Sequence, residues 1–555
     1  MTTLTTVIRP PCDEAAIRAR AAVAPAPRHA EPWILSATIL GSSLSFIDGT
    51  VVNVALPALQ HEFGAGATDV QWVIEAYALF LSALILVGGS LGDRFGRRRV
   101  FALGIVLFTL ASIGCGLAPS LLALIIGRAI QGIGGALLVP GSLAIISASF
   151  DEARRGRAIG TWSGFTTVTS ALGPVLGGFL VQSVSWRAVF FLNVPVALIT
   201  LAIVRTHVPE SRDMHATGRL DWRGAALATI GLGALVFGLI ESSARGLGDG
   251  LVLAALLVGV AALALFVVTE ARGHAPMVPL ALFRSRGFTG ANLLTLLLYA
   301  GLGGSLYFLP FHLQQVQGYS PAAAGAALLP MTVIIFALSR WSGGLVRRYG
   351  AKPPLVIGPV VAAAGFALFA LPGLGGSYWT TYFPAIVVLS LGMALVIAPL
   401  TTTVMNAATT EHAGAASGIN NSVSRASGLL AVAAMNLVVA RVFSARYLDG
   451  LAALPLPASA RAALAAQSAR LAGIQLPAGL DSGARQALER LISTAFLGGF
   501  RAAMLIGAAL ALASAVTAAL LIPGKAAQGE PARERAPAWR GWAAVRQRLA
   551  RTPAS

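Results

Sequence analysis

The sequence predicts an all-α polytopic membrane protein with fourteen transmembrane helices. Hydrophobic residues make up 56% of the 555 residues and charged residues only 11%, whereas a soluble domain carries about 25% charged residues. The mean hydropathy is +0.76, and the 61 glycines fit membrane helices, in which glycine is commoner than in soluble ones. The apolar residues also fall into long stretches, and about 20 residues suffice to cross the bilayer core.

The fourteen spans divide into two bundles of six and an inserted pair. The expected regions are a tail at 1–32, a six-helix bundle at 33–204, linkers with two inserted helices at 205–287, a second six-helix bundle at 288–522 and a tail at 523–555. In chain order the spans are 33–57, 71–92, 99–118, 121–147, 156–182, 187–204, 224–241, 251–270, 288–312, 322–344, 353–373, 379–401, 415–440 and 496–522.

Arginines set the expected orientation, because basic residues concentrate in the cytoplasmic loops of membrane proteins. They cluster in alternate loops, for example Arg94, Arg97 and Arg98 after the second span and Arg154 and Arg155 after the fourth. Both termini are therefore predicted to be cytoplasmic. Arginine and alanine are abundant and lysine is scarce, which is typical of a GC-rich bacterial genome and predicts the bacterial inner membrane.

One predicted outer loop, 446–494, is long. Its prolines, Pro455, Pro457 and Pro477, are expected to interrupt helices. Within it, 461–472 has the pattern of an amphipathic helix.

Composition also excludes several ligands. The net charge of +18 lies in short loops without interleaved aromatics, so contact with anionic membrane lipid is expected rather than nucleic acid. The basic tail at 523–555 suits either an amphipathic segment on the inner leaflet or a disordered end.

No phosphate-binding loop of the form GxxxxGK[ST] is present, so no nucleotide is expected. Cys12 and Cys115 show no metal-ligand spacing, and no metal or other cofactor is predicted.

An internal repeat supports two related bundles. Residues 89–98 read GSLGDRFGRR, and residues 343–352 read GGLVRRYGAK. Both segments follow an apolar span and face the predicted cytoplasm. Repeated halves are typical of secondary transporters, whose bundles move about a central site.

Among the charged residues within the predicted spans, Asp48, Glu75, Arg128 and Arg425 are the candidates for function. A charge at the centre of a membrane helix costs about 2.5–3.5 kcal/mol on insertion scales, so it normally faces a cavity or a partner. Asp48 and Arg128 each lie about eight residues from the outer end of their spans, which is roughly 12 Å deep. The pair therefore predicts either proton handling or a structural ion pair. Glu75 suits a second protonation site or contact with headgroups, and Arg425 is expected to line a cavity.

Uncharged polar residues in the spans are further candidates for substrate binding. They are Asn53, Gln131, Asn292, Tyr299 and Asn421. Few hydrogen-bonding groups among aromatic walls suit a large amphipathic substrate. Tyr307, Phe308 and Phe311, near the end of the ninth span, are interpreted mainly as an interfacial aromatic belt.

Four motifs resemble the major facilitator superfamily, specifically its fourteen-span drug:proton antiporter branch, and the resemblance covers about 33–522. The motifs are Gly89-Ser-Leu-Gly-Asp93-Arg94-Phe-Gly96-Arg97-Arg98-Arg99, Asp48-Gly-Thr-Val-Val-Asn53-Val-Ala-Leu-Pro57, Gly127-Arg128-Ala-Ile-Gln131-Gly132-Ile-Gly134-Gly135 and Gly173-Pro174-Val-Leu-Gly177-Gly178.

The resemblance implies a role for each motif. In the family, the loop with Gly89, Asp93, Arg94, Gly96 and Arg97 helps to latch the two halves on the cytoplasmic side; a topology anchor is the alternative. An aspartate at the place of Asp48 belongs to the family signature, and spans 1 and 4 adjoin, so Asp48 and Arg128 are expected to meet.

The fourth motif carries the expected direction of transport. The pattern of Gly173, Pro174, Gly177 and Gly178 is typical of the family's antiporters and generally absent from its uniporters and symporters; a packing kink is the alternative.

Together these features predict a major facilitator fold that exports small hydrophobic or cationic drugs or secondary metabolites in exchange for protons by alternating access. A lipid or glycolipid exporter of the same fold is the main alternative. A fourteen-span peptide importer is disfavoured, because the first span lacks the ExxER motif of that group. A membrane enzyme or sensor is disfavoured, because the seven histidines are scattered and no soluble domain is expected.

Overall fold

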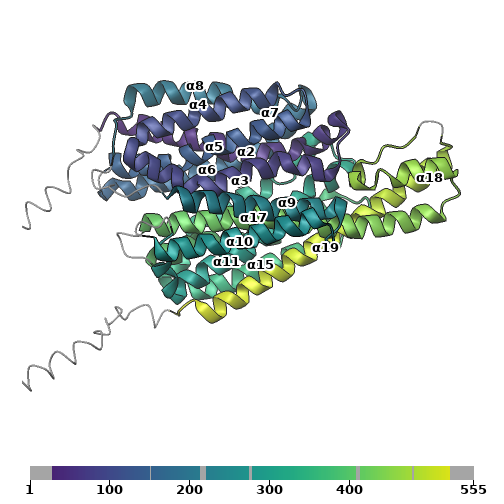
Figure 1. Ribbon diagram of the computed structural model, residues 1–555. Coiled ribbons are helices and arrows are strands. Elements are labelled where there is room, and N and C mark those ends of the chain that lie inside the picture. Colours follow the sequence, from purple (N-terminus) through teal and green to yellow (C-terminus); the bar gives the residue numbers. More distant parts are fainter. Residues whose placement is uncertain are drawn as a thin grey trace, which may run out of the picture.

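The computed structural model describes residues 28–150, 152–212, 221–273, 278–407, 413–477 and 480–524, which contain helices and loops but no β-strand. Most of the predicted tails, 1–32 and 523–555, and Cys12 with them, lie outside the described residues. Every predicted span overlaps one or more helices. The all-α polytopic architecture is confirmed (Figure 1).

In the described part of the chain, the N-terminal bundle has seven helices, of which α7 is a single turn that leads into α8. They are α2 (Glu31–Phe63), α3 (Ala67–Phe95), α4 (Arg97–Gly116), α5 (Leu121–Ser149), α6 (Glu152–Ser183), α7 (Ala188–Phe191) and α8 (Asn193–His207). α5 packs against both α3 and α4, and α2 packs against α5, α6 and α8. This arrangement sets α2 and α5, which carry Asp48 and Arg128, side by side.

The C-terminal bundle follows the inserted pair. Its elements are η1 (Leu280–Arg284), α11 (Arg286–Tyr307), α12 (Leu309–Phe311), η2 (His312–Val316), α13 (Pro321–Ala326), α14 (Leu329–Tyr349), α15 (Lys352–Phe369), α16 (Tyr378–Asn406), α17 (Ala413–Ala453), α18 (Ala458–Ala465), η4 (Ser468–Gly473) and α19 (Ser482–Leu521). α11 packs against α17 and α19, and α15 packs against α16 and α19.

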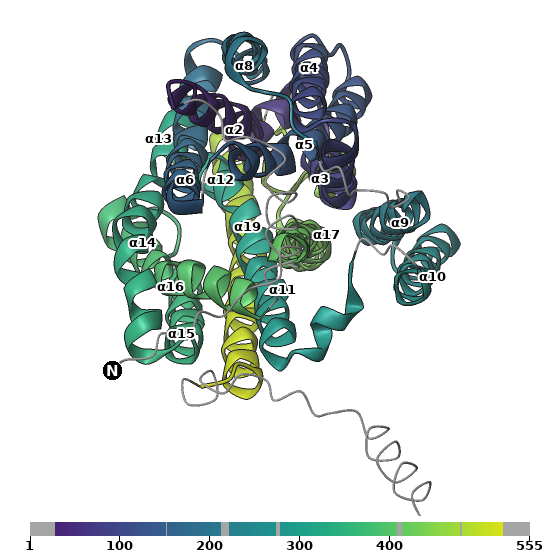
Figure 2. The ribbon, with the colours of Figure 1, turned by 90° about the vertical axis from the view of Figure 1, so that its left-hand side faces the viewer.

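The inserted helices, α9 (Trp222–Arg245) and α10 (Gly250–Arg272), form a hairpin on the side of the molecule. α9 contacts α3 of one bundle and α17 of the other, whereas α10 packs mainly on α9 (Figure 2). The pair therefore covers one lateral junction of the two bundles. Large apolar side chains such as Leu257 on α10 and Leu520 on α19 are exposed at 69% and 75%, as expected of a surface that faces lipid.

Thirteen helices of the described chain are long and apolar enough to cross a membrane. The remaining predicted span, 156–182, lies in α6. The apolar part of α6 is the stretch Val168–Ser183, which is shorter than the other thirteen. The count of fourteen is thus one above what length and composition alone support.

Helices occupy much of the predicted outer loop at 446–494. α17 and α19 have 41 and 40 residues, about 60 Å each at 1.5 Å per residue, and they continue well into it. The predicted amphipathic helix at 461–472 is replaced by α18 and η4. Buried apolar residues at helical spacing, Tyr447 and Leu451 on α17 and Leu488 and Ile492 on α19, continue both helices. The result is a projection at one end of the molecule (Figure 1).

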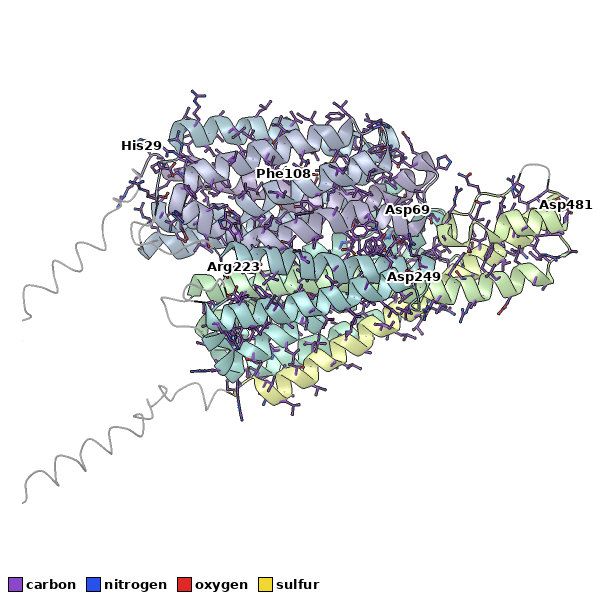
Figure 3. All side chains as sticks on the ribbon, in the orientation of Figure 1. His29, Asp69, Phe108, Arg223, Asp249 and Asp481 are labelled. Atoms are coloured by element: carbon purple, nitrogen blue, oxygen red, sulfur yellow. The ribbon has the colours of Figure 1, made fainter. Side chains whose placement is uncertain are left out.

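Polar residues mark the two ends of the bundles. His29 and Arg223 lie at one end, and Asp69, Asp249 and Asp481 lie at the other (Figure 3). The Asp249 side chain accepts hydrogen bonds from the first amides of α10, and this N-terminal capping fixes where the helix begins. We call the end with Asp69 the outer end, in keeping with the predicted orientation, and the other the cytoplasmic end.

Candidate functional site

Asp48 and Arg128 form a buried ion pair inside the N-terminal bundle. Nη1 of Arg128 donates to Oδ2 of Asp48 over 2.5 Å, and the two side chains are 1% and 0% exposed. The guanidinium also donates to the carbonyl oxygen of Val73 over 2.9 Å and lies 4.2 Å from the centre of the Tyr77 ring. The structure thus brings together the two charges that the sequence places at one depth.

Three neutral side chains complete this network. Gln131 Nε2 donates to Asp48 Oδ1 over 2.9 Å, and Asn193 Nδ2 donates to the same oxygen over 3.3 Å. Asn193 also donates to the hydroxyl of Ser112 over 2.9 Å. Both carboxylate oxygens of Asp48 are therefore satisfied, as a buried charge requires. Sequence reasoning missed Ser112 and Asn193; their only signal was polarity within apolar stretches.

Two predicted substrate residues lie elsewhere than expected. Gln131 is 0% exposed and belongs to the ion-pair network, so in this arrangement it offers no surface to a substrate. Asn53 donates to the carbonyl oxygen of Gly49 in its own helix, over 3.4 Å, and has no bond to the network among the described residues.

Glu75 is buried at the junction between the bundles. It is 1% exposed, so the alternative of contact with headgroups is wrong for this arrangement. Oε1 accepts a hydrogen bond from Gln71 over 3.3 Å, whereas Oε2 has no partner among the described residues. Glu75 thus differs from Asp48, whose carboxylate is paired with the guanidinium of Arg128.

A small polar cavity of about 110 Å³ lies between α11, α16 and α17. Tyr299 and Asn421 line it, together with Leu400, Thr401, Val404, Met405, Asn420 and Ser424. Asn420 donates to Asn292 Oδ1 over 3.2 Å and so joins that residue to the cavity wall. Three of the predicted substrate residues, Asn292, Tyr299 and Asn421, therefore gather at one place.

Arg425 lies one helical turn beyond Asn421 and is half-buried. It has no hydrogen bond or ion pair within the described part of the chain, but it interacts electrostatically with Tyr77 of the N-terminal bundle. This cation therefore lies where the two bundles face each other.

The turn between α3 and α4 is held by charged side chains. Asp93 Oδ1 lies 2.7 Å from Nη2 of Arg97. Glu210, which follows α8, accepts from the amide of Arg98 over 3.1 Å, and its Oε1 lies 2.6 Å from where a Cβ on Gly96 would be. Glu210 was not predicted. The contacts tie the turn within the N-terminal bundle, and the latch between bundles stays a prediction.

Gly96→Ala is expected to lower the unfolding temperature of the purified protein. Gly96 has φ of 109°, which side chains rarely adopt, and the new Cβ would displace Glu210. The expected cost is about 1–3 kcal/mol. Thermal unfolding in detergent is the measurement. Gly114→Ala is the control, because a Cβ there has nothing within 4 Å. Equal unfolding temperatures for both variants would contradict the proposed constraint.

The glycine and proline motif of α6 forms a close contact between the bundles. A Cβ on Gly178 would meet the carbonyl oxygen of Pro321 in α13, and a Cβ on Gly325 of α13 would meet that of Pro174. Gly173 and Gly177 face Thr50 and Val51 of α2 in the same way. The motif therefore packs α6 between α2 and the C-terminal bundle, as small residues do in membrane helices.

Further contacts close the outer end. Gln314 Nε2 donates to the carbonyl oxygen of Val54 over 3.1 Å, and Gln315 Nε2 donates to Oε1 of Gln60 over 2.9 Å. Gln60 in turn donates to the carbonyl oxygen of Arg470 in η4 over 2.8 Å. The projection therefore contacts the end of α2.

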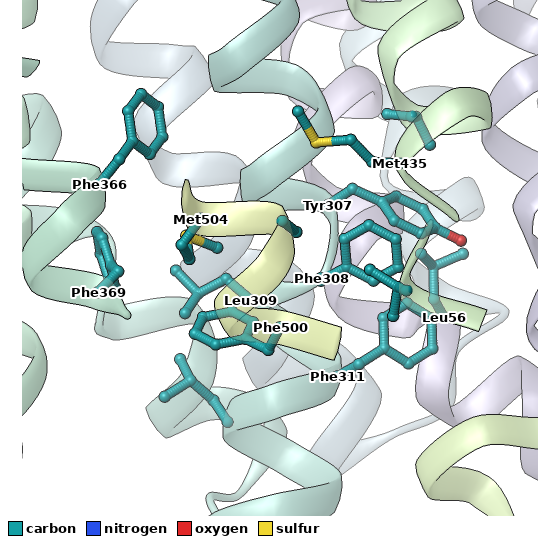
Figure 4. Close-up of a cluster of buried hydrophobic side chains, with 14 of the residues drawn as sticks. Leu56, Tyr307, Phe308, Leu309, Phe311, Phe366, Phe369, Met435, Phe500 and Met504 are labelled. Atoms are coloured by element: carbon teal, nitrogen blue, oxygen red, sulfur yellow. The ribbon is translucent and has the colours of Figure 1, made fainter. Parts of the chain in front are cut away.

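An aromatic cluster lies beneath these bonds. Tyr307, Phe308 and Phe311 pack with Leu56 of the N-terminal bundle (Figure 4). They are 5%, 1% and 4% exposed, so their interpretation as an interfacial belt is wrong. They form part of the apolar seal between the bundles at the outer end.

Two helical bundles that meet near buried charged side chains and are joined by contacts at one end have the architecture of a polytopic membrane transporter. The profile of the Major Facilitator Superfamily matches residues 38–432, and the chain belongs to this family.

Relatives extend over most of the chain. It is 35% identical over 514 residues to the tetracenomycin C resistance and export protein of Streptomyces glaucescens, covering 91% of this chain and 94% of that one. It is 36% identical over 430 residues to a puromycin resistance protein of Streptomyces alboniger, covering 77% and 85%. Among solved structures, a bacterial homologue of the human lysosomal transporter Spinster shares the fold, with a TM-score of 0.60, 18% identity and coverage of 88% and 98%.

Proposed function

We propose that this chain is a secondary active transporter that exports small hydrophobic or amphipathic drugs or secondary metabolites in exchange for protons. The observation that carries the proposal is the 35% identity over 91% of the chain to a resistance and export protein. Buried carboxylates at membrane depth support proton exchange, since ionisable residues in membrane helices mark ion pathways. The proposed location is the inner membrane of a bacterium, with both termini in the cytoplasm.

The proposed mechanism is alternating access between the two bundles. The contacts at the outer end, between α6 and α13 and between α2 and η2, would break when the site opens outward. Protons would then enter from outside and substrate would leave. One charge moved through 100 mV supplies about 2.3 kcal/mol, near a fifty-fold concentration gradient, which is enough for export without ATP.

The cavity at Tyr299 and Asn421 is the proposed start of a substrate path. Its volume of about 110 Å³ is below the roughly 300 Å³ of a drug-sized pocket, so the bundles must move apart to admit substrate. Arg425, one turn away, would add a positive charge to the enlarged site.

A cellular efflux screen tests the proposal. Bacterial cells that lack their own efflux pumps would express the wild type or Asp48→Asn and be loaded with ethidium, other dyes and antibiotics. We expect the wild type to expel at least one compound and to stop when a protonophore collapses the proton gradient. We expect Asp48→Asn to lose efflux through the damaged ion-pair network. Efflux that persists without a proton gradient would contradict the proposal.

Lipid analysis of the same cells tests the alternative of lipid export. An altered surface-lipid composition with unchanged sensitivity to every compound would favour a lipid or glycolipid exporter of this fold. Changed compound sensitivity with unchanged lipids would favour drug export.

A further inference from the structure

Glu75 lies on the face of α3 that meets the C-terminal bundle. It precedes Leu79 by four residues and Leu86 by eleven, and these spacings return to one side of a helix. Leu79 belongs to a buried cluster with Leu429 of α17. A Cβ on Gly418 of α17 would lie 2.9 Å from Leu86. The carboxylate of Glu75 is therefore directed at the other bundle rather than at lipid.

Two polar side chains of the C-terminal bundle lie at the same junction. Asn436 follows Gly418 by eighteen residues, which is five helical turns and thus the same face of α17. Its neighbour Met435 accepts a hydrogen bond from Ser305 of α11 over 3.8 Å. Tyr307, two residues further along α11, is close enough to Glu75 for the two side chains to interact electrostatically. Figure 4 shows its hydroxyl oxygen at the edge of the apolar cluster, directed away from Met504.

These side chains are buried with unpaired polar atoms. Gln71, Glu75, Asn436 and Tyr307 are 0%, 1%, 1% and 5% exposed. Glu75 Oε2, Gln71 Oε1, the Tyr307 hydroxyl and both amide atoms of Asn436 have no hydrogen-bond partner among the described residues. An unsatisfied buried group costs about 1–3 kcal/mol, and native interiors hold few of them. Several such groups from both bundles at one junction indicate a site that binds something.

We propose that Glu75, surrounded by Gln71, Tyr307 and Asn436, is the site that carries the exchanged proton, and that Asp48 is a structural partner of Arg128. The inference rests on the proposed proton exchange and identifies the carboxylate that performs it. The proton is bound at Glu75 as a carboxylic acid, whose O–H has unpaired acceptors nearby. The proton comes from a hydronium ion in the entering water, whose O–H bond breaks as the O–H of the acid forms, and it returns to water when the acid ionises.

The size of the site favours a proton over the exported molecule. A drug-sized ligand needs a cavity of roughly 300 Å³ or more, whereas Glu75 is 1% exposed. A proton needs no volume, only a path of water when the bundles part.

Charge separates Glu75 from Asp48. An ionised carboxylate without a countercharge costs several kcal/mol to bury, so the neutral acid is the form that the surroundings of Glu75 accept. The carboxylate of Asp48, in contrast, is paired with the guanidinium of Arg128. Several charged groups on α3 and on the elements packed against it have partners of their own: Asp48 with Arg128, Glu241 with Arg245, Asp93 with Arg97, and Arg470 with the Gly64 carbonyl. Arg425 of α17 interacts electrostatically with Tyr77.

The location couples protonation to movement. Glu75 lies on one bundle and Tyr307 and Asn436 on the other, so parting of the bundles separates the acid from its neighbours. The aromatic seal with Tyr307 lies beside it at the outer end. Opening of that end admits water and protons to Glu75, and closure is favourable only after the carboxylate has been neutralised.

Infrared difference spectroscopy on the purified protein tests the site without any substrate. We expect the wild type to show the carbonyl band of a buried carboxylic acid at neutral pH, and Glu75→Gln to lack it. Glu241→Gln is the control, because it removes a carboxylate of the neighbouring helix that is paired with Arg245. A band that persists in Glu75→Gln would overturn the proposal.

Transport in proteoliposomes provides the second test, with ethidium or whichever dye the wild type expels as the probe. We expect Glu75→Gln to equilibrate the dye but to accumulate none when a pH gradient is imposed, and Glu75→Asp to retain accumulation. Gradient-driven accumulation by Glu75→Gln would overturn the assignment. Dye transport by the wild type that does not depend on the pH gradient would contradict proton exchange itself. In that case the infrared band would still show whether the buried carboxylic acid is Glu75.

Discussion

Arg128→Leu is expected to destabilise the protein by about 3–5 kcal/mol, because the substitution leaves the carboxylate of Asp48 buried and without a countercharge. It also removes the donor to the Val73 carbonyl oxygen. The measurement is thermal unfolding in detergent, together with the yield of monodisperse protein. Arg187→Leu is the matched control, since Arg187 pairs with Glu62 at the surface, with exposures of 36% and 44%, and such pairs contribute about 0–1 kcal/mol.

The double variant Asp48→Asn with Arg128→Leu tests whether the unpaired charge causes this loss of stability. Removing both charges should recover part of the lost stability, because no ionised group is left buried alone. Two results would contradict a stabilising role of the ion pair. Arg128→Leu could unfold at the temperature of the wild type, or the double variant could be no more stable than Arg128→Leu.

Gly178→Val is expected to impair transport strongly while the protein still folds. The side chain would meet the Pro321 carbonyl oxygen and the Cα of Ala322, and backbone atoms in close-packed helices cannot move aside locally. The contact between α6 and α13 must then open at the outer end. Because the contact joins two bundles, we expect each bundle to keep its own packing and transport to fall at least about tenfold, equivalent to 1.4 kcal/mol.

Cysteine labelling from outside measures that opening. In a chain with Cys12 and Cys115 replaced by alanine, a cysteine at position 56, within the aromatic seal, should react faster with an impermeant maleimide when Gly178→Val is present. Gly114→Ala, with open space at its Cβ, should leave labelling and transport unchanged. Unaltered labelling and transport in Gly178→Val would refute the role of this contact.

The fold could be predicted because it depends on local composition. Each apolar stretch of about 20 residues specifies a membrane helix whatever its neighbours are. The exception is 446–494, where prolines suggested a loop. Tyr447 and Leu488 continue the apolar faces of α17 and α19. Many polar residues lie between these apolar positions, so the helical pattern is harder to recognise in the sequence than that of a membrane span.

The site was predicted in part, for a related reason. A charge in a membrane helix is conspicuous, so Asp48, Glu75, Arg128 and Arg425 could be selected from the sequence. Which of them pair depends on how the helices are rotated and which neighbours they have. Asn193, Ser112 and Glu210 were missed because a single polar residue gives no sign of the helix that it will meet. Tyr307 was misinterpreted because an aromatic residue near a span end has the same local pattern in a belt and in a seal.

Accumulation of a dye by purified protein in vesicles tests the central claim most directly. The vesicles would contain no ATP, and a pH gradient of known size would be the only source of energy. The proposed proton exchange predicts that the wild type concentrates ethidium, or another dye that it expels from cells, above its outside concentration and loses it when the gradient is dissipated. Mere equilibration of the dye, equal with and without the gradient, would contradict it.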